Sequence, residues 1–225
     1  MKKIILIALM VILCLPVKAQ EKFNGIGIFK IGMDTSTLIS YANQNSYSIK
    51  NCSDFTEYIQ YKNDNFKLLV RLYHHDDNSL SIPSVSSNPY VSNYLITLYY
   101  VSGLTINNIE LTFYKNALIQ FTVKDNFDID KGMEEKYGKG SVEILHLTSQ
   151  CLDDADVDRS YFTTWKNGKI KAYRSILEQF DENCQKSYNS SFTYFVDNKE
   201  LDKWNNEIEK KSSKLLKNPE QIKDF

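Results

Sequence analysis

Apolar side chains recur at every second position in several parts of this chain, and this alternation constrains the fold more than any other feature. In the stretch 66–73, for example, Leu68 and Val70 share one face of an extended chain while Arg71 points to the other. A period of two is typical of β-strands that have one buried face. We therefore predict an α+β fold with antiparallel sheets, short helices packed on one face and a C-terminal amphipathic helix.

Two of the alternating stretches, 109–113 and 119–123, form a predicted hairpin whose register follows from arithmetic. Both apolar rows face the core only if paired positions sum to an even number, because a shift of one residue turns a strand over. Pairing Phe113 with Ile119 satisfies this condition. The tip then contains 115–117, where Asn116 tolerates a left-handed conformation.

A second hairpin is predicted around Asn167-Gly168, because Asn-Gly is a preferred two-residue turn between strands. The strands are 161–166 and 169–177, with Trp165 opposite Ile170 and Thr163 opposite Ala172 on a core face. The other face carries two aromatic and three basic side chains: Phe162, Tyr173, Lys166, Lys169 and Lys171. In this register Phe162 lies opposite Tyr173, and Lys166 lies opposite Lys169. Facing lysines require water or an acidic partner. We name this face as the candidate binding surface, and a solvated outer face is the alternative.

The remaining elements are predicted from capping residues and periodicity. Asp34 caps a helix over 35–45 with Leu38, Ile39 and Ala42 on its apolar stripe. A long loop is expected over 74–93, which contains Pro83 and Pro89. The other predictions are strands at 55–61, 66–73, 94–101 and 192–196, a helix capped by Asp128 or Asp130 and ended by Gly138, and an amphipathic helix that starts at Asp197 and ends at Asn218-Pro219.

Residues 1–19 have the organisation of a signal peptide. Lys2-Lys3 precede the apolar run 4–13, and Ala19 is a small residue suited to cleavage before Gln20. The apolar run is too short to span a membrane, which needs about 20 residues. We expect an exported protein of the periplasm or cell surface. Lipid anchoring through Cys14 is the alternative, although Leu13 stands where a small residue is usual.

Composition after cleavage describes an acidic globular protein. The whole chain has 27 basic and 28 acidic residues, and removal of Lys2, Lys3 and Lys18 leaves 24 against 28, a net charge of −4. This balance argues against a nucleic-acid-coating role, and 42% hydrophobic residues argue against disorder. We predict one compact body over 20–225, in which two sheet-and-helix units, about 23–125 and 126–217, can be distinguished.

Three cysteines remain after cleavage, so at most one intramolecular disulfide can form. Cys151 and Cys184 bracket the second hairpin, whose ends meet, and we predict that they pair. Cys52 is then the thiol left over. Three reduced, packed cysteines are the alternative.

Motifs that carry chemistry are weak in this sequence. Asp154, Asp156 and Asp158 have the spacing of the first ligands of a calcium loop, but Arg159 stands where glycine is required. They are weak candidates for a looser metal site, as is the cluster from His74 to Asp77. We predict no catalytic residue, no cofactor and no resident metal.

The segment Phe29-Lys30-Ile31-Gly32-Met33-Asp34 resembles the opening of small envelope modules typified by the BamE (SmpA/OmlA) family and the β-lactamase-inhibitor-protein fold. A later pattern, from Leu111 to the Lys136-Tyr137-Gly138 sequence, is similar to one common in exported proteins of this kind, and the mature N-terminus looks like those of the Bacteroidetes. Asp34 takes the capping position of that opening, but Thr37 stands three residues later, where a capping box usually has an acidic or amide residue. The resemblance implies helices on an antiparallel sheet and a non-catalytic role in envelope protein contacts.

These observations favour a secreted or periplasmic binding module whose partner is another envelope protein. A hydrolase that acts on envelope polysaccharide or protein through two carboxylates is the alternative from a different class, because such carboxylates can meet from distant parts of a chain. A toxin-neutralising inhibitor or immunity protein is the third reading.

Overall fold

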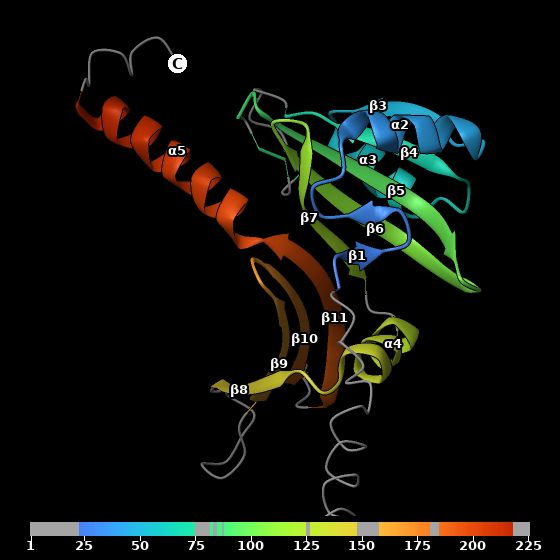
Figure 1. The fold of residues 1–225 in the computed structure, drawn as a ribbon, viewed down its shortest axis with the longest axis vertical. Helices are drawn as coiled ribbons and strands as arrows, with labels where there is room; N and C mark the ends of the chain where they lie inside the picture. Colours follow the sequence, from blue (N-terminus) through green and yellow to red (C-terminus); the bar gives the residue numbers. More distant parts are fainter. Residues whose placement is uncertain are drawn as a thin grey trace, which may run out of the picture.

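The computed structural model describes residues 23–74, 82, 85–86, 88–124, 127–147, 158–180 and 185–217. Nearly half of them belong to one nine-stranded sheet, shown in Figure 1. Its strands, in spatial order, are β3 (Ser48–Cys52), β4 (Leu68–Leu72), β5 (Val91–Val101), β6 (Leu104–Tyr114), β7 (Ala117–Lys124), β11 (Lys186–Asp197), β10 (Ile170–Phe180), β9 (Asp158–Asn167) and β8 (Ser141–Leu147).

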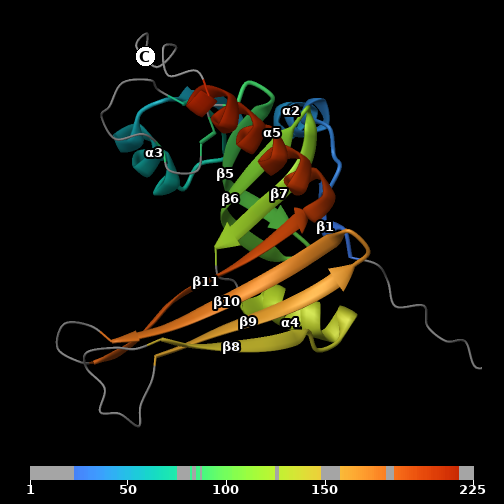
Figure 2. The same cartoon turned by 90° about the vertical axis from the view of Figure 1, so that its left-hand side faces the viewer.

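Helices lie on both faces of this sheet. The back face carries α2 (Thr35–Gln44), α4 (Phe127–Tyr137) and a small hairpin of β1 (Gly25–Ile26) and β2 (Phe29–Lys30). The front face carries α3 (Phe55–Lys62), and α5 (Asn198–Lys217) crosses in front of β5 to β7 (Figure 2). The predicted α+β class is confirmed, with helices on two faces rather than one.

Alternation within β4 shows how the two faces are filled. Leu69 belongs to the large core behind the sheet, whereas Leu68 and Val70 belong to a smaller cluster in front of it. The large cluster includes Leu38 of α2, Met133 of α4 and residues of both predicted sheet-and-helix units. A single continuous core therefore lies behind both halves of the sheet.

The first predicted helix is confirmed. Asp34 caps α2, and its Oδ1 accepts a hydrogen bond from the Ser36 N–H at 2.7 Å. Leu38 and Ala42 are buried against the sheet, whereas Ile39 on the same predicted stripe is exposed.

The predicted strand at 55–61 is wrong, because this segment forms helix α3. Asp54 caps it by accepting hydrogen bonds from the N–H groups of Thr56 and Glu57 at 2.8 and 3.0 Å. The aromatic and β-branched side chains that suggested a strand instead place Tyr58 against the front cluster. Helix α3 thus connects β3 to β4, which pair in parallel, in an otherwise antiparallel sheet.

The β6–β7 hairpin combines the predicted register with a different turn. Leu111 faces Phe121, an even sum as expected, but Phe113 faces Leu118 rather than Ile119. A β-bulge between these pairs accounts for the change. Next to the two-residue turn the paired positions have an odd sum, and the one extra residue of the bulge makes the sum even along the rest of the hairpin. The turn is Lys115-Asn116, with φ of 50° and 66°.

The second hairpin also differs in register. Its two turn residues are Gly168-Lys169, so Ala172 faces Trp165 and Lys171 faces Lys166. The φ of Gly168 is 58°, as the first position of this turn requires. Asn167 is held outside the turn, where its Nδ2 donates to the Phe23 carbonyl at 2.6 Å. The sum of paired positions stays odd, so every residue keeps its predicted face while its partner changes.

The later helices end and begin close to the predicted positions. Gly138, with a φ of 79°, follows the last residue of α4, and Trp165 Nε1 donates to its carbonyl at 2.8 Å. Neither Asp128 nor Asp130 is the cap of α4, since both lie in its first turn. Asp197 does cap α5, as predicted, by accepting from the N–H groups of Lys199 and Glu200.

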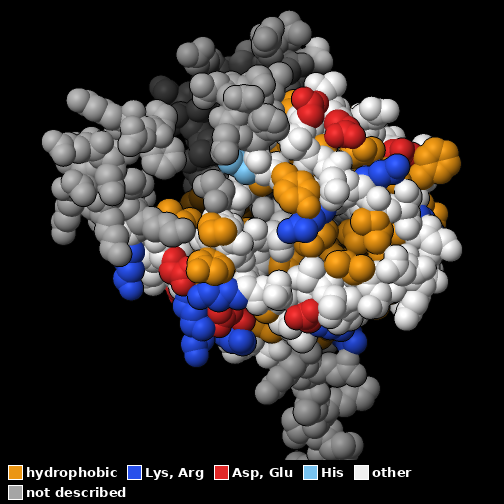
Figure 3. All heavy atoms as spheres, turned by 90° about the horizontal axis from the view of Figure 1, so that it is seen from above, with side chains coloured by type: hydrophobic (Ala, Val, Ile, Leu, Met, Phe, Trp, Pro, Cys, Tyr) orange, Lys and Arg blue, Asp and Glu red, His pale blue; other side chains and the backbone are white. Residues whose placement is uncertain are grey.

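Within the described residues, no helix is both long and apolar enough to cross a membrane. The end of the molecule that carries α2 and α3 shows apolar side chains spread among charged ones (Figure 3). The predicted signal peptide and Cys14 lie outside the described residues, as do Cys151, Cys184, Asp154, Asp156 and half of the predicted loop over 74–93.

Candidate functional site

The pairing of strands places two rows of side chains side by side along the front face. Residues directly opposite one another in a sheet share a face, so each row can be followed from strand to strand. The first row is Cys52, Leu72, Asn93, Thr112, Gln120, Val196, Lys171 and Lys166. The second is Lys50, Val70, Leu95, Glu110 and Thr122, and it continues beyond β11 with Tyr173, Thr164 and Ser141.

The chemistry of these rows changes from one end of the sheet to the other. Beneath α3 they are apolar and buried on β4 and β5, as Val70 and Leu95 show with 0% exposure, and only Lys50 on the edge strand is charged and exposed. At the centre they consist of amides, hydroxyls and the carboxylate of Glu110. At the far end they carry Lys166, Lys171 and Tyr173, where no described helix covers the front of β8 to β10 (Figure 2). The front face is therefore covered at the α3 end, polar at its centre and uncovered at the end formed by β8 to β10.

Four of the five residues of the predicted binding surface lie together on this open end. Phe162, Lys166, Lys171 and Tyr173 share the front face, with Lys166 exposed and the other three half-buried. Phe162 faces Ser175 and Tyr173 faces Thr164, so the two rings are diagonal neighbours rather than the predicted direct pair. Lys166 and Lys171 face each other, and no ion pair joins either of them to a described residue.

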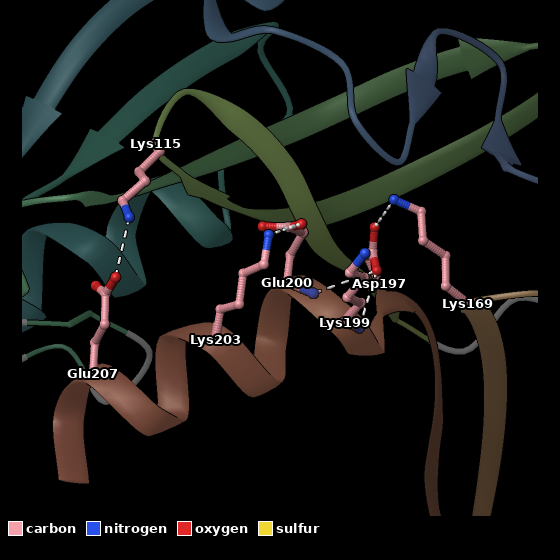
Figure 4. Close-up of polar contacts among 7 residues, drawn as sticks. All are labelled: Lys115, Lys169, Asp197, Lys199, Glu200, Lys203 and Glu207. Atoms are coloured by element: carbon pink, nitrogen blue, oxygen red, sulfur yellow. Dashed lines mark hydrogen bonds and ion pairs between the residues drawn. The ribbon is translucent and has the colours of Figure 1, made fainter. Parts of the chain in front are cut away.

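The fifth residue, Lys169, has a structural role instead. It lies in the turn, and its Nζ contacts the buried Asp197 carboxylate at 2.7 Å. The hydrogen bond to Asp197 raises the pKa of Lys169, so the ammonium stays charged through the neutral range. Lys169 is thereby removed from the open surface and joins the hairpin to the start of α5 (Figure 4).

A cleft lies at the polar centre of the face, between the sheet and α5. It encloses about 170 Å³ and is lined on the sheet side by Asn93, Glu110, Thr112, Gln120 and Thr122, and on the helix side by Trp204. A second contact between α5 and the sheet joins Lys115 to Glu207 at 3.0 Å (Figure 4). Helix α5 is thus attached at its first residues and again at Glu207, with the cleft beneath it.

Glu110 is the charged group of this cleft, and α3 neutralises it. Tyr58 Oη donates to its carboxylate at 2.6 Å and Lys62 Nζ at 2.8 Å. Burial acts to lower the pKa of Lys62, but the hydrogen bonds to Glu110 and Tyr58 outweigh it and the pKa is raised. The Glu110 carboxylate is therefore joined to Lys62 in an ion pair.

Buried carboxylates elsewhere in the described structure also face cations. Asp130 contacts Arg174 at 2.8 Å, and Asp197 contacts Lys169 at 2.7 Å. A catalytic pair of facing carboxylates, as the hydrolase hypothesis requires, is not formed by these groups or by Glu110. The described residues also contain no group of three metal-ligating side chains.

The other candidates from the sequence lie away from the cleft. Asp158 begins β9, and the remaining aspartates of its run are not described. His74 lines a cavity of about 340 Å³ beside Arg71 and Asn88, at the ends of β4 and β5. Cys52 is a free, buried thiol whose pKa is raised by burial to about 11, which makes it a poor nucleophile.

Sequence reasoning missed the cleft because it did not place β11 between β7 and β10. The signal was nevertheless present in 110–112 and 120–122. Glu110 and Thr112 alternate with buried Ile109 and Leu111, so parity alone puts the polar residues on one face. Only the strand order shows that this face continues into the lysines of β9 and β10.

Comparisons with models of protein families, with characterised proteins and with solved structures find no match to this chain.

Proposed function

We propose that the chain is a secreted or periplasmic, non-catalytic binding module that captures another envelope protein on the open end of its front face. The observation that supports this most directly is the pair Lys166 and Lys171, which face each other on a half-buried aromatic surface. Two like charges directly opposite destabilise a sheet unless water or an acidic group separates them. An acidic partner would relieve that repulsion.

The aromatic neighbours give the same surface an apolar component. Phe162 and Tyr173 are half-buried; Tyr173 is a diagonal neighbour of Lys166, and Phe162 lies beyond it as a diagonal neighbour of Tyr173. Aromatic anchors surrounded by charged groups are typical of protein interfaces, in which a few residues supply most of the binding free energy. The partner surface that fits is therefore acidic at its rim and apolar at its centre.

The compartment in this proposal comes from the sequence. The signal-peptide pattern of 1–19 supports export, and the resemblance of Phe29–Asp34 to envelope modules of the BamE kind supports a role in protein contacts. The buried carboxylates that face cations give the hydrolase alternative no corresponding support.

Charge reversal at both lysines tests the proposal. The double variant Lys166→Glu, Lys171→Glu keeps the like-charge repulsion but changes its sign, so the melting temperature should stay nearly unchanged. Capture of an envelope protein by the immobilised chain from residue 20 should fall at least tenfold. The wild-type complex should also weaken as the salt concentration rises, because the Debye length, over which charges interact, falls to about 10 Å at 0.1 M salt.

The matched control reverses two exposed lysines away from the front face, Lys30→Glu and Lys139→Glu. It changes the net charge by the same amount and should retain capture. Equal loss in both variants would attribute the effect to net charge, and unchanged capture in the first variant would contradict the proposed surface.

A further inference from the structure

The cleft beneath α5 contains several polar groups that have no partner among the residues that the structure describes. Trp204 lines the cleft, and its buried Nε1 has no acceptor among the described residues. The side chains of Gln120 and Thr122, which line the opposite wall, make no hydrogen bond within the described chain. A buried indole N–H without an acceptor is costly, and it is normally satisfied by water or a ligand.

The groups that do pair in the cleft keep part of their hydrogen-bonding capacity. Thr112 Oγ1 donates to Asn93 Oδ1 at 3.1 Å, which leaves the Asn93 amide N–H groups and the Thr112 lone pairs. Amides and hydroxyls each offer donors as well as acceptors. The walls therefore match a ligand whose groups also donate and accept at once.

The electrostatics of the cleft favour an uncharged ligand. Glu110 is the one carboxylate among the lining residues, and its charge is balanced by Lys62 at 2.8 Å. An anion would meet the carboxylate, and a cation would compete with an ammonium that is already held by two hydrogen bonds. Among the lining residues, therefore, neither an anionic nor a cationic ligand would find an opposite charge that is not already paired.

Size narrows the ligand further. The cleft holds about 170 Å³, the space of roughly six water molecules at about 30 Å³ each. A space of this size suits a single small ring. An extended peptide, which lengthens by about 3.4 Å with each residue, would soon extend beyond it. An indole also offers an apolar surface on which the C–H groups of a sugar ring can pack.

We propose that this cleft binds a neutral sugar unit, with Gln120, Thr122, Asn93 and the Trp204 indole N–H as its hydrogen-bonding groups. The site is separate from the Lys166 and Lys171 surface, which lies on other strands. The inference goes beyond the proposed protein contact, and each can fail without the other.

The two tryptophans allow a direct test by NMR of the ¹⁵N-labelled chain from residue 20. Trp165 Nε1 donates to the Gly138 carbonyl in the core behind the sheet, so its indole signal serves as an internal reference. Glucose, galactose, mannose and N-acetylglucosamine are titrated separately. At least one should shift the Trp204 indole signal with saturation on the order of 1 mM, and the Trp165 signal should stay in place.

Two variants assign the effect to the cleft. Thr122→Val keeps the shape of the side chain and removes the hydroxyl, and it should weaken sugar binding about tenfold. Thr105→Val is the matched control on β6, at the far end of the β5–β6 ladder opposite Tyr100, and it should bind as the wild type does. Both variants should give wild-type spectra elsewhere, which shows that they fold.

The remaining outcomes overturn the proposal. If none of the four sugars moves the Trp204 signal, the cleft holds water only. If N-acetyl-alanyl-alanine amide moves it and the sugars do not, the site recognises peptide. If glucuronate saturates the site at lower concentration than glucose, the cleft selects for charge, contrary to the neutral pairing of Glu110.

Discussion

The two ends of the front face are built on the same sheet but differ in what covers them. At one end, Val70 and Leu95 lie fully buried beneath α3. At the other, Tyr173 and Thr164 occupy the same row and are half-buried, with no described helix in front of them. Residues of the same row therefore differ in burial according to whether a helix covers them.

Connectivity explains the difference. Because β3 and β4 are parallel, the chain between them must cross over the sheet, and α3 makes that crossing on the front face. The strands β9, β10 and β11 are antiparallel, so short connections join them and place no helix in front. One parallel pair closes one end of the face, and antiparallel pairing leaves the other end open for contact.

The largest test of this comparison uses one truncation at each end of the same row. Leu95→Ala should lower the free energy of unfolding by about 3 kcal/mol, because it removes buried methyl groups and leaves a cavity beneath α3. Thr164→Ala at the open end should cost less than about 1 kcal/mol. Urea denaturation of both variants provides the measurement, and equal losses would mean that the open end is as tightly packed as the closed one.

The second test measures how strongly the closed end excludes water, through Cys52. Burial raises the pKa of this thiol from 9.0 to about 11. Between these values the unfolded chain releases the proton while the folded chain retains it, so stability should decrease as pH rises from about 9 to 11. Comparison with Cys52→Ala isolates this contribution from that of the tyrosines.

Alkylation gives an independent measure of the same property. Iodoacetamide followed by peptide mapping should leave Cys52 unmodified in the folded protein at pH 8 and modify it in urea. Modification of the folded protein at a rate typical of exposed thiols would contradict a dry cluster beneath α3.

The smallest expected effects concern α5, which covers the centre of the face. Asp197→Ala removes the cap of this helix together with the contact to Lys169, and it should cost about 1–2 kcal/mol. Lys115→Ala removes the exposed contact to Glu207 and should cost less than about 0.5 kcal/mol. Thermal unfolding checks both, and the reverse order would make the Glu207 contact the main attachment of α5.

Local signals in the sequence predicted much of the fold. Asp34 and Asp197 act as helix caps, and Gly138 ends α4, because caps depend on side chains next to the backbone they satisfy. The faces of β9 and β10 also followed from parity. The predicted pairing of Phe162 with Tyr173 was wrong, because turn position depends on contacts such as that between Asn167 and Phe23.

Features that depend on distant contacts could not be predicted. Asp54 and Glu57 were available as helix signals in 55–61, but the aromatic residues there fit either element until the sheet provides a surface for Tyr58. The cleft was missed for the same reason. It requires β7 to pair with β11, two strands separated by more than 60 residues.

The place of β11 in the sheet also has a consequence for the order in which the fold can assemble. This strand is the last of the described strands in chain order, yet it lies inside the sheet between β7 and β10. As the chain emerges during synthesis or translocation, the strands on either side of β11 appear first and lack the partner that joins them. The sheet can close only after Asp197 has emerged, so a chain that stops short of β11 retains two unpaired strand edges, one on β7 and one on β10.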